Sequence, residues 1–199
     1  MGIFTGTGVA MITPFDAQGN VDVAALRRIT THLIEGKAEY LVVLGTTGES
    51  ATLTESEQHQ VIETVMESAE KRIPVVLGAG GNDTAAVCKK AEALSRRYAP
   101  TGLLSVNPYY NKPTQEGIYQ HFKAIAASTD LPVILYNVPG RSASNVLAAT
   151  TLRLAHEVSN IVAVKEASGN LDQITEIIAQ KPAGFQVLAG DDSLALPVA

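Results

Sequence analysis

One pattern recurs along the whole chain and restricts the folds that it can adopt. A short apolar run is followed by a polar or glycine-rich turn and then by an amphipathic stretch, about every 25 to 35 residues. This is the length of a βα unit, in which a helix connects one buried strand to the next parallel strand. The predicted strands are Gly8–Thr13, Tyr40–Leu44, Ile73–Leu77, Gly102–Val106, Leu131–Leu135, Ile161–Val164 and Phe185–Leu188.

The stretches between these runs carry the signals that begin and end helices. Several of these predicted helices are preceded by a residue whose side chain can accept a hydrogen bond from an N–H group of the first turn. Thr54 is followed three residues later by Glu57, which is the pattern of a capping box. Gly36 suits the position just after a helix end, where the backbone is left-handed. The predicted caps are Asp22, Thr54, Asp83 or Thr84, and Asn170.

Seven strands that alternate with helices leave an open doubly wound sheet or a (β/α)8 barrel. A nucleotide-binding doubly wound sheet should carry a glycine-rich fingerprint after its first strand, but Pro14 stands there. The segment Gly78–Asp83 comes nearest and fails because Asp83 occupies the place of the last glycine. We therefore predict an α/β fold, the (β/α)8 TIM barrel, as a single domain over residues 1–199. Seven strands do not close such a barrel, so either the sequence is a fragment or another segment fills the gap.

Composition excludes several classes of protein. The chain of 199 residues is 46% hydrophobic and 18% charged, which is typical of a globular domain. The net charge of −5, without a densely basic stretch, argues against a nucleic-acid partner. No apolar run is long enough to cross a bilayer, and the N-terminus lacks the pattern of a secretory signal. With a single cysteine there is no internal disulfide, so we expect a cytoplasmic protein without a membrane partner.

Lys165 is the residue with the clearest chemical potential. It ends the apolar run Ile161–Val164, which is β-branched and fits a strand buried on both faces. A lysine in such a place is hard to solvate, and desolvation favours the neutral amine, which is a nucleophile for carbonyl carbon. The alternative is a structural lysine whose ammonium group reaches water from the strand end.

Other candidate residues follow the neighbouring strands. The loop 45–50 has glycines that let backbone N–H groups approach a ligand, and it suits a small carboxylate or is an ordinary βα turn. Tyr109 and Tyr110 are loop aromatics of a surface or an interface. Tyr136 could relay protons, and Arg141 could bind a carboxylate through two hydrogen bonds or form a salt bridge at the rim.

The candidates point to one chemistry. A desolvated amine, phenols, hydroxyl groups and a carboxylate-binding arginine suit a lysine that condenses with a 2-oxo acid, whose imine then makes the neighbouring carbon a nucleophile. Glu49 and Glu166 are potential acids after different strands. No metal or organic cofactor is required, and the four histidines show no ligand spacing: His32, His59, His121 and His156.

Three motifs in order make a family recognisable. Gly-Thr-Thr-Gly-Glu-Ser (45–50), Tyr-Asn-Val-Pro-Gly-Arg (136–141) and Val-Lys-Glu-Ala-Ser-Gly (164–169) resemble the dihydrodipicolinate synthase family, a branch of the pyruvate-dependent class I aldolases. The resemblance implies catalytic roles for four residues. Lys165 would form a Schiff base with pyruvate, and Tyr136 would donate and accept protons. Thr46 would link Tyr136 to Tyr110, which reaches in from a neighbouring subunit.

The resemblance also implies the substrates. Thr47 would bind the pyruvate carboxylate, Gly190 would belong to the substrate-binding set, and Arg141 would receive the carboxylate of L-aspartate 4-semialdehyde. The condensation would give 4-hydroxy-tetrahydrodipicolinate for diaminopimelate and lysine biosynthesis. Members of the family are usually homotetramers, built as dimers of dimers. Their chains are longer, so the resemblance implies that the eighth strand and the C-terminal helices of the TIM barrel are missing from this chain.

Two alternatives and one departure accompany this reading. A sibling pyruvate aldolase, such as an N-acetylneuraminate lyase or a 2-keto-3-deoxy sugar acid aldolase, would keep Lys165 and Tyr136, and Arg141 argues against it. An inactive truncated paralogue is the other alternative. The departure concerns the inhibitory lysine site of some relatives, at positions that here carry Glu55, Gln58 and Ala86 although Ser50, Asn82 and Tyr109 are retained. Weak or absent inhibition by lysine is the expectation.

Overall fold

The computed structural model describes residues 4–198 and divides into two compact units, 4–78 and 79–198. Each unit is built from parallel strands that alternate with helices, as the repeating sequence pattern predicts. The prediction of one domain over residues 1–199 stays a prediction.

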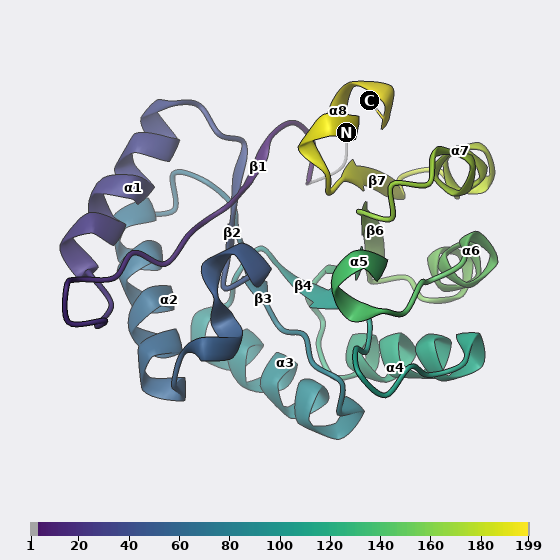
Figure 1. The fold of residues 1–199 in the computed structure, drawn as a ribbon, viewed down its shortest axis with the longest axis horizontal. Helices are drawn as coiled ribbons and strands as arrows, with labels where there is room; N and C mark the ends of the chain where they lie inside the picture. Colours follow the sequence, from purple (N-terminus) through teal and green to yellow (C-terminus); the bar gives the residue numbers. More distant parts are fainter. Residues whose placement is uncertain (1–3, 199) are drawn as a thin grey trace. The chain divides into compact units, whose positions relative to one another are not determined.

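The unit 4–78 contains three strands in the order β1-β2-β3, namely β1 (Gly8–Ala10), β2 (Tyr40–Val43) and β3 (Val75–Gly78). The residues of β2 and β3 are all buried, so these strands form the core of the unit. Helices α1 (Val23–Glu35) and α2 (Glu55–Ala69) pack against each other beside the strands (Figure 1). Two short 3-10 turns follow β2: η1 (Thr46–Gly48) and η2 (Ser50–Thr52).

The helix caps predicted from the sequence are present at α1 and α2, but the end of α1 differs. Thr54 and Glu57 form both hydrogen bonds of a capping box, and Asp22 accepts from the N–H of Ala25 at 2.8 Å. Gly36, however, has a φ of −72°, and Lys37 takes the left-handed conformation with a φ of 62°. The helix therefore ends one residue later than Gly36 would suggest, and the N–H of Ala38 bonds to the carbonyl of Leu33 as in a Schellman motif.

The unit 79–198 contains four parallel strands in the order β4-β5-β6-β7: β4 (Gly102–Val106), β5 (Val133–Asn137), β6 (Ile161–Glu166) and β7 (Gln186–Ala189). Figure 1 shows the helices α4, α6 and α7 along one side of these strands. The helices of the unit are α3 (Thr84–Tyr98), α4 (Gln115–Ala127), α5 (Pro139–Ser142), α6 (Ala148–Glu157), α7 (Leu171–Gln180) and α8 (Ala195–Val198), with the 3-10 turn η3 (Asp192–Leu194) before α8.

Three strands of this unit extend further along the chain than the sequence predicts. β5 ends at Asn137 rather than Leu135, β6 ends at Glu166 rather than Val164, and β7 ends at Ala189 rather than Leu188. The backbone ladder continues through these polar residues because Tyr136 pairs with Lys165 and Asn137 pairs with Glu166. The side chains predicted to follow the strands are therefore held within them.

His121 gives this unit a predicted sensitivity to acid. Its side chain is 3% exposed in α4, and its Nδ1 lies 2.8 Å from the hydroxyl of Thr84 at the start of α3. Burial lowers the pKa of His121 from 6.5 to about 4, because charging the ring inside the protein is unfavourable. The folded state therefore stays neutral while the unfolded state binds a proton. Stability is fully present above pH 6.5 and is lost as the pH falls from 6.5 towards 4, by no more than roughly 3 kcal/mol.

This expectation is checked by urea unfolding at a series of pH values between 7 and 4. The His121→Gln variant should lose less unfolding free energy over this range than the wild type, since it has no ring to protonate. His32→Gln is the control because His32 is exposed on α1, and it should keep the pH dependence of the wild type. Parallel curves for the wild type and His121→Gln would contradict the assignment.

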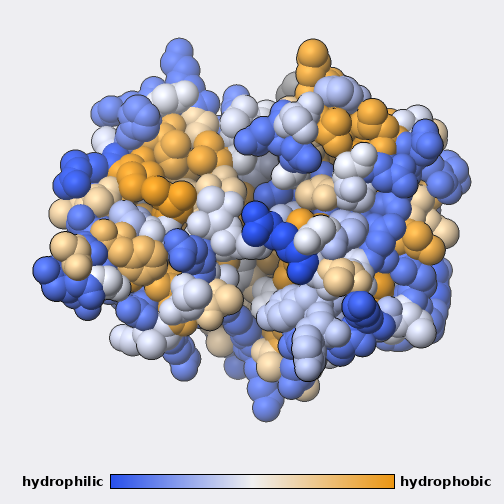
Figure 2. Space-filling view, in the orientation of Figure 1, coloured by the Kyte–Doolittle hydropathy of each residue, from blue (hydrophilic) through white to orange (hydrophobic). Residues whose placement is uncertain are grey.

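Exposed apolar side chains remain on the surface of the unit 79–198. Figure 2 shows apolar groups over the C-terminal segment with α8, where Leu196 is the most exposed of the large aliphatic residues. No helix within residues 4–198 is both long enough and apolar enough to span a membrane.

Candidate active site

Lys165 lies on β6 directly beside Tyr136 on β5. The two residues are paired in the register of the parallel strands, and the Nζ of Lys165 lies 4.7 Å from the centroid of the Tyr136 ring. Tyr136 is buried, and Lys165 is half-buried. The strand pairing thus brings together the amine and the phenol that the sequence analysis assigns to one reaction.

The environment of Lys165 favours its uncharged form. Burial lowers the pKa of the amine, because the surrounding protein solvates an ammonium ion less well than water does. The carboxylate of Asp192, at the start of η3, acts in the opposite direction and raises the pKa, but burial is the larger effect. A larger fraction of this lysine is therefore a neutral nucleophile near pH 7 than of an exposed lysine.

Gly190 leaves the space that the stem of Lys165 occupies. A Cβ atom added at Gly190 would lie 3.1 Å from both Cγ and Cε of Lys165, and 2.8 Å from the Cβ of Ala167. The N–H of Gly190 also donates to the carbonyl of Glu166 at 2.8 Å, which fixes the end of β7 against β6. A side chain at this position would require Ala167 to shift and would crowd the stem of Lys165.

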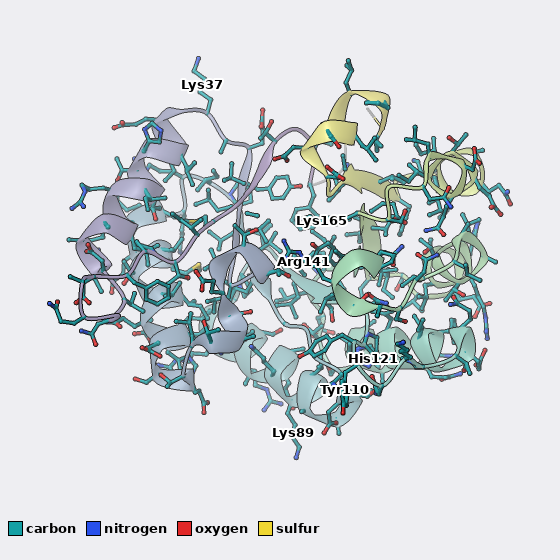
Figure 3. All side chains as sticks on the ribbon, in the orientation of Figure 1. Lys37, Lys89, Tyr110, His121, Arg141 and Lys165 are labelled. Carbon is teal, nitrogen blue, oxygen red and sulfur yellow. The ribbon has the colours of Figure 1, made fainter. Side chains whose placement is uncertain are left out.

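Arg141 lies on α5, a single turn that follows β5. Pro139 begins this turn, and the N–H of Arg141 donates to the carbonyl of Val138 at 2.9 Å. The side chain is exposed, and none of the ion pairs within residues 4–198 involves it, so the alternative of a rim salt bridge is not seen there. Figure 3 shows Arg141 and Lys165 in the same part of the view.

Tyr110 lies apart from this group. It is 88% exposed, and its backbone has a φ of 70°. Its position in the loop is fixed from both sides, because Asn82 donates to the carbonyl of Tyr109 at 3.2 Å and Asn111 donates to the carbonyl of Asn82 at 3.2 Å. Figure 3 shows Tyr110 on the side of His121, away from Lys165. A contact with the active site of a neighbouring subunit stays a prediction.

Thr46 and Thr47 belong to the unit 4–78. Both are exposed in the turn η1, which begins after Gly45. The turn is fixed by Thr13, whose hydroxyl donates to the carbonyl of Gly48 at 2.7 Å. The roles predicted for these two threonines, in the proton relay and in carboxylate binding, stay predictions.

Glu166 has a different environment from the one expected of a free acid at a strand end. Its side chain is 1% exposed and accepts hydrogen bonds from Asn137 and Gln173. No role was predicted for Gln173, or for Asn137 beyond its place in the motif 136–141. The signal that could have found Asn137 is its place directly after Tyr136, just as Glu166 directly follows Lys165.

The acidic, histidine and cysteine side chains of residues 4–198 do not form a metal site. Within the described part of the chain, no three His, Cys, Asp or Glu side chains are grouped so that they could hold an ion. The four histidines lie on separate helices, α1, α2, α4 and α6. The prediction that the chemistry needs no metal stays a prediction.

Parallel strands joined by helices, with a partly desolvated lysine beside a tyrosine at the strand ends, define an α/β protein of the barrel class with a candidate imine-forming site. A family model described as the Dihydrodipicolinate synthetase family matches residues 3–199, and the chain belongs to this family. This confirms the family that the three motifs indicate.

Curated relatives are similar over almost the whole of this chain. The 4-hydroxy-tetrahydrodipicolinate synthase of Flavobacterium psychrophilum is 52% identical over 199 residues, which are 100% of this chain and 67% of that protein. The 4-hydroxy-tetrahydrodipicolinate synthase 1 of Halalkalibacterium halodurans is 54% identical over 192 residues, 95% of this chain and 63% of that protein. The chain therefore spans about two thirds of the length of the relatives it matches.

Solved structures agree with the fold. The dihydrodipicolinate synthase of Bacillus anthracis superposes with a TM-score of 0.95 at 45% identity, over 100% of this chain and 67% of that one. The enzyme of Acinetobacter baumannii, solved in complex with pyruvate, gives a TM-score of 0.93 at 41% identity, over 97% of this chain and 66% of that one. The predicted barrel class is confirmed, and so is the prediction that this chain is shorter than a full barrel of the family.

Proposed function

We propose that the protein carrying this chain is a lyase of the class I aldolase type that condenses pyruvate with L-aspartate 4-semialdehyde to give 4-hydroxy-tetrahydrodipicolinate. The observation that carries the proposal is the position of the Lys165 amine, 4.7 Å from the ring centroid of Tyr136. Burial also lowers the pKa of this amine. The curated relatives named as this synthase and the pyruvate complex of the Acinetobacter baumannii enzyme support the choice of substrates.

The reaction begins with the amine of Lys165, which attacks the ketone carbon of pyruvate. Water leaves and an imine forms, and the imine withdraws electrons so that the methyl carbon can lose a proton. The resulting enamine attacks the aldehyde carbon of the second substrate. The amino group of that substrate then attacks the imine carbon, which closes the ring and releases Lys165. Tyr136 is proposed to move the protons of these steps, because its hydroxyl belongs to the residue nearest the amine along the β5–β6 register.

The remaining predicted residues are proposed to bind pyruvate, to hold the lysine and to relay protons. Thr47 binds the pyruvate carboxylate, Gly190 keeps the lysine stem in place, and Thr46 and Tyr110 complete the proton relay. The exposure of Tyr110 supports a contribution to a neighbouring subunit. We accordingly propose a cytoplasmic homotetramer that serves diaminopimelate and lysine biosynthesis and needs no cofactor.

Borohydride reduction in the presence of pyruvate tests the proposal. The folded protein, as its gene encodes it in full, should gain a stable pyruvate-derived mass at Lys165. Addition of L-aspartate 4-semialdehyde should then yield the cyclised product. A pyruvate adduct without cyclised product would favour a sibling aldolase, and a folded protein without any adduct would favour an inactive paralogue.

Arg141→Ala should separate the two substrates. Loss of a charge-assisted hydrogen-bonded pair should raise the KM for L-aspartate 4-semialdehyde roughly 10- to 100-fold. The pyruvate adduct should form at the rate of the wild type, because the arginine acts only on the second substrate. Steady-state kinetics with each substrate varied in turn measures this difference. An unchanged KM for the semialdehyde would remove the binding role.

A further inference from the structure

The residues that follow Tyr136 and Lys165 form a second pair on the opposite face of the strands. Successive side chains of a strand point to opposite faces, so Asn137 and Glu166 turn away from the amine and the phenol. Both are buried, with 0% and 1% exposure, and the Nδ2 of Asn137 lies 3.0 and 3.1 Å from the two carboxyl oxygens of Glu166. The same register therefore pairs the candidate catalytic residues on one face and two hydrogen-bonded residues on the other.

The carboxyl group of Glu166 accepts hydrogen bonds from several segments of the chain. Besides Asn137 on β5, it accepts from the backbone N–H of Ser168 at 2.9 Å and from the Nε2 of Gln173 on α7 at 3.0 Å. All three donors are amide N–H groups. None of the ion pairs within the described residues involves Glu166. Burying a carboxyl group raises the free energy of the folded state unless hydrogen bonds replace those it made with water. Distortion of these bonds would therefore destabilise the strand ends.

Asn137 extends the connection to the loop that follows Arg141. Its Oδ1 accepts from the N–H of Val146 at 3.0 Å, and its Nδ2 also lies 2.8 Å from the Oδ1 of Asn145. The Nδ2 of Asn145 donates in turn to the Oε1 of Gln173 at 2.8 Å. The four side chains thus form a closed set, which we call the strand-end network: Asn137, Asn145, Glu166 and Gln173.

We propose that Glu166 is a positioning residue, which acts through the strand-end network to hold the Lys165 amine at its working distance from Tyr136. The inference rests on the proposed function, because it concerns the formation of the imine. Lys165 and Glu166 are adjacent on one strand, so a shift of the Glu166 backbone moves Lys165 directly. A misplacement of about 1 Å can slow an enzymatic step about 100-fold.

Glu166→Gln is the sharpest probe of this role. It keeps the shape of the side chain but replaces one acceptor oxygen by an NH2 group. Either orientation of the new amide turns an N–H towards Asn137 and towards one further donor, Ser168 or Gln173. Asn137 can still donate to the oxygen that remains, but the further donor loses its acceptor, and we expect the strand ends to shift apart there.

The experiment measures imine formation with pyruvate by rapid quenching with borohydride, in the full protein as its gene encodes it. At saturating pyruvate, Glu166→Gln should form the adduct roughly 10- to 100-fold more slowly than the wild type. The pyruvate concentration at half-saturation should change less than about threefold, since Glu166 is not proposed to contact the substrate. A merely structural loss would lower the amount of active protein without changing the rate constant of the folded fraction.

Two further variants make the test decisive. Ile125→Val removes one buried methyl group from α4 and should lower the stability without slowing imine formation, as a control for destabilisation alone. Gln173→Met keeps the length of the side chain on α7 but replaces the amide by a thioether, which removes one donor to Glu166 and the acceptor of Asn145. It should slow imine formation less than Glu166→Gln does. It also replaces Glu166→Gln should that variant fail to fold.

The outcomes are distinct. The positioning role would be overturned if the rate constant of Glu166→Gln lay within twofold of the wild type, and the proposed function would still stand. If Glu166→Gln does not fold, the rate constant of Gln173→Met decides in the same way. The positioning role would also be overturned if Ile125→Val slowed the reaction as much. Absence of an adduct in the folded wild type would overturn the proposed function and this inference together.

Discussion

Lys165→Ala is expected to abolish the borohydride-trapped pyruvate adduct and the turnover that depends on it. No other side chain can replace the amine as the atom that bonds to the ketone carbon, so the loss should be complete rather than partial. The fold should remain, because the substitution removes a half-buried amine whose burial is unfavourable for its charged form. Mass spectrometry after reduction and urea unfolding measure the two effects separately.

Lys181→Ala is the matched control for this variant. Its Nζ donates to the carbonyl of Phe185 at 2.7 Å, so the residue has a structural contact away from the β5–β6 register. This control should keep the adduct while losing some stability. If Lys165→Ala still gained pyruvate-derived mass, or kept the turnover of the wild type, another residue would carry the imine.

The second large effect is expected for Tyr136→Phe. Removal of a positioned proton donor and acceptor should lower kcat about 10²- to 10⁴-fold, since general acid–base catalysis contributes a factor of this size. The ring remains and still packs beside Lys165, so the stability of the fold should change little. The measurement is kcat with both substrates saturating, together with the rate of adduct formation from pyruvate alone.

Tyr119→Phe controls for the loss of a tyrosine hydroxyl elsewhere. The hydroxyl of Tyr119 donates to the carboxylate of Glu157 at 2.6 Å, and the guanidinium of Arg153 lies 3.6 Å from the ring centroid, so α4 and α6 are joined there. This variant should lose stability and keep its kcat. Equal kcat values for Tyr136→Phe and the wild type would exclude Tyr136 from proton transfer.

The sequence predicts the strands and most helix caps well because these features depend on neighbouring residues. The apolar runs and the capping box of Thr54 and Glu57 are local, and they appear as expected. Lys165 and Tyr136 could be singled out because a lysine and a phenol at the ends of buried strands are chemically unusual. Their distance could not be predicted, since it depends on the register between β5 and β6.

The remaining features depend on contacts between distant segments. Asn137 and Glu166 look like the first residues of loops, because a polar residue after an apolar run usually marks a strand end. Only the pairing of the two strands shows that both belong to the ladder and bond to each other. Gln173 lies on a helix further along the chain, and Lys37 rather than Gly36 takes the left-handed backbone because the helix makes one more hydrogen bond.

The absence of a Cβ atom at Gly190 has a consequence for attempts to change the substrate of this fold. Mutant libraries aimed at a lysine-dependent pocket normally randomise every nearby position. Here even a methyl group would crowd the stem of Lys165 and press against Ala167, so we expect substitutions at Gly190 to shift the amine. Arg141 lies exposed on the separate turn α5, so we expect substitutions there to leave the position of the Lys165 amine unchanged.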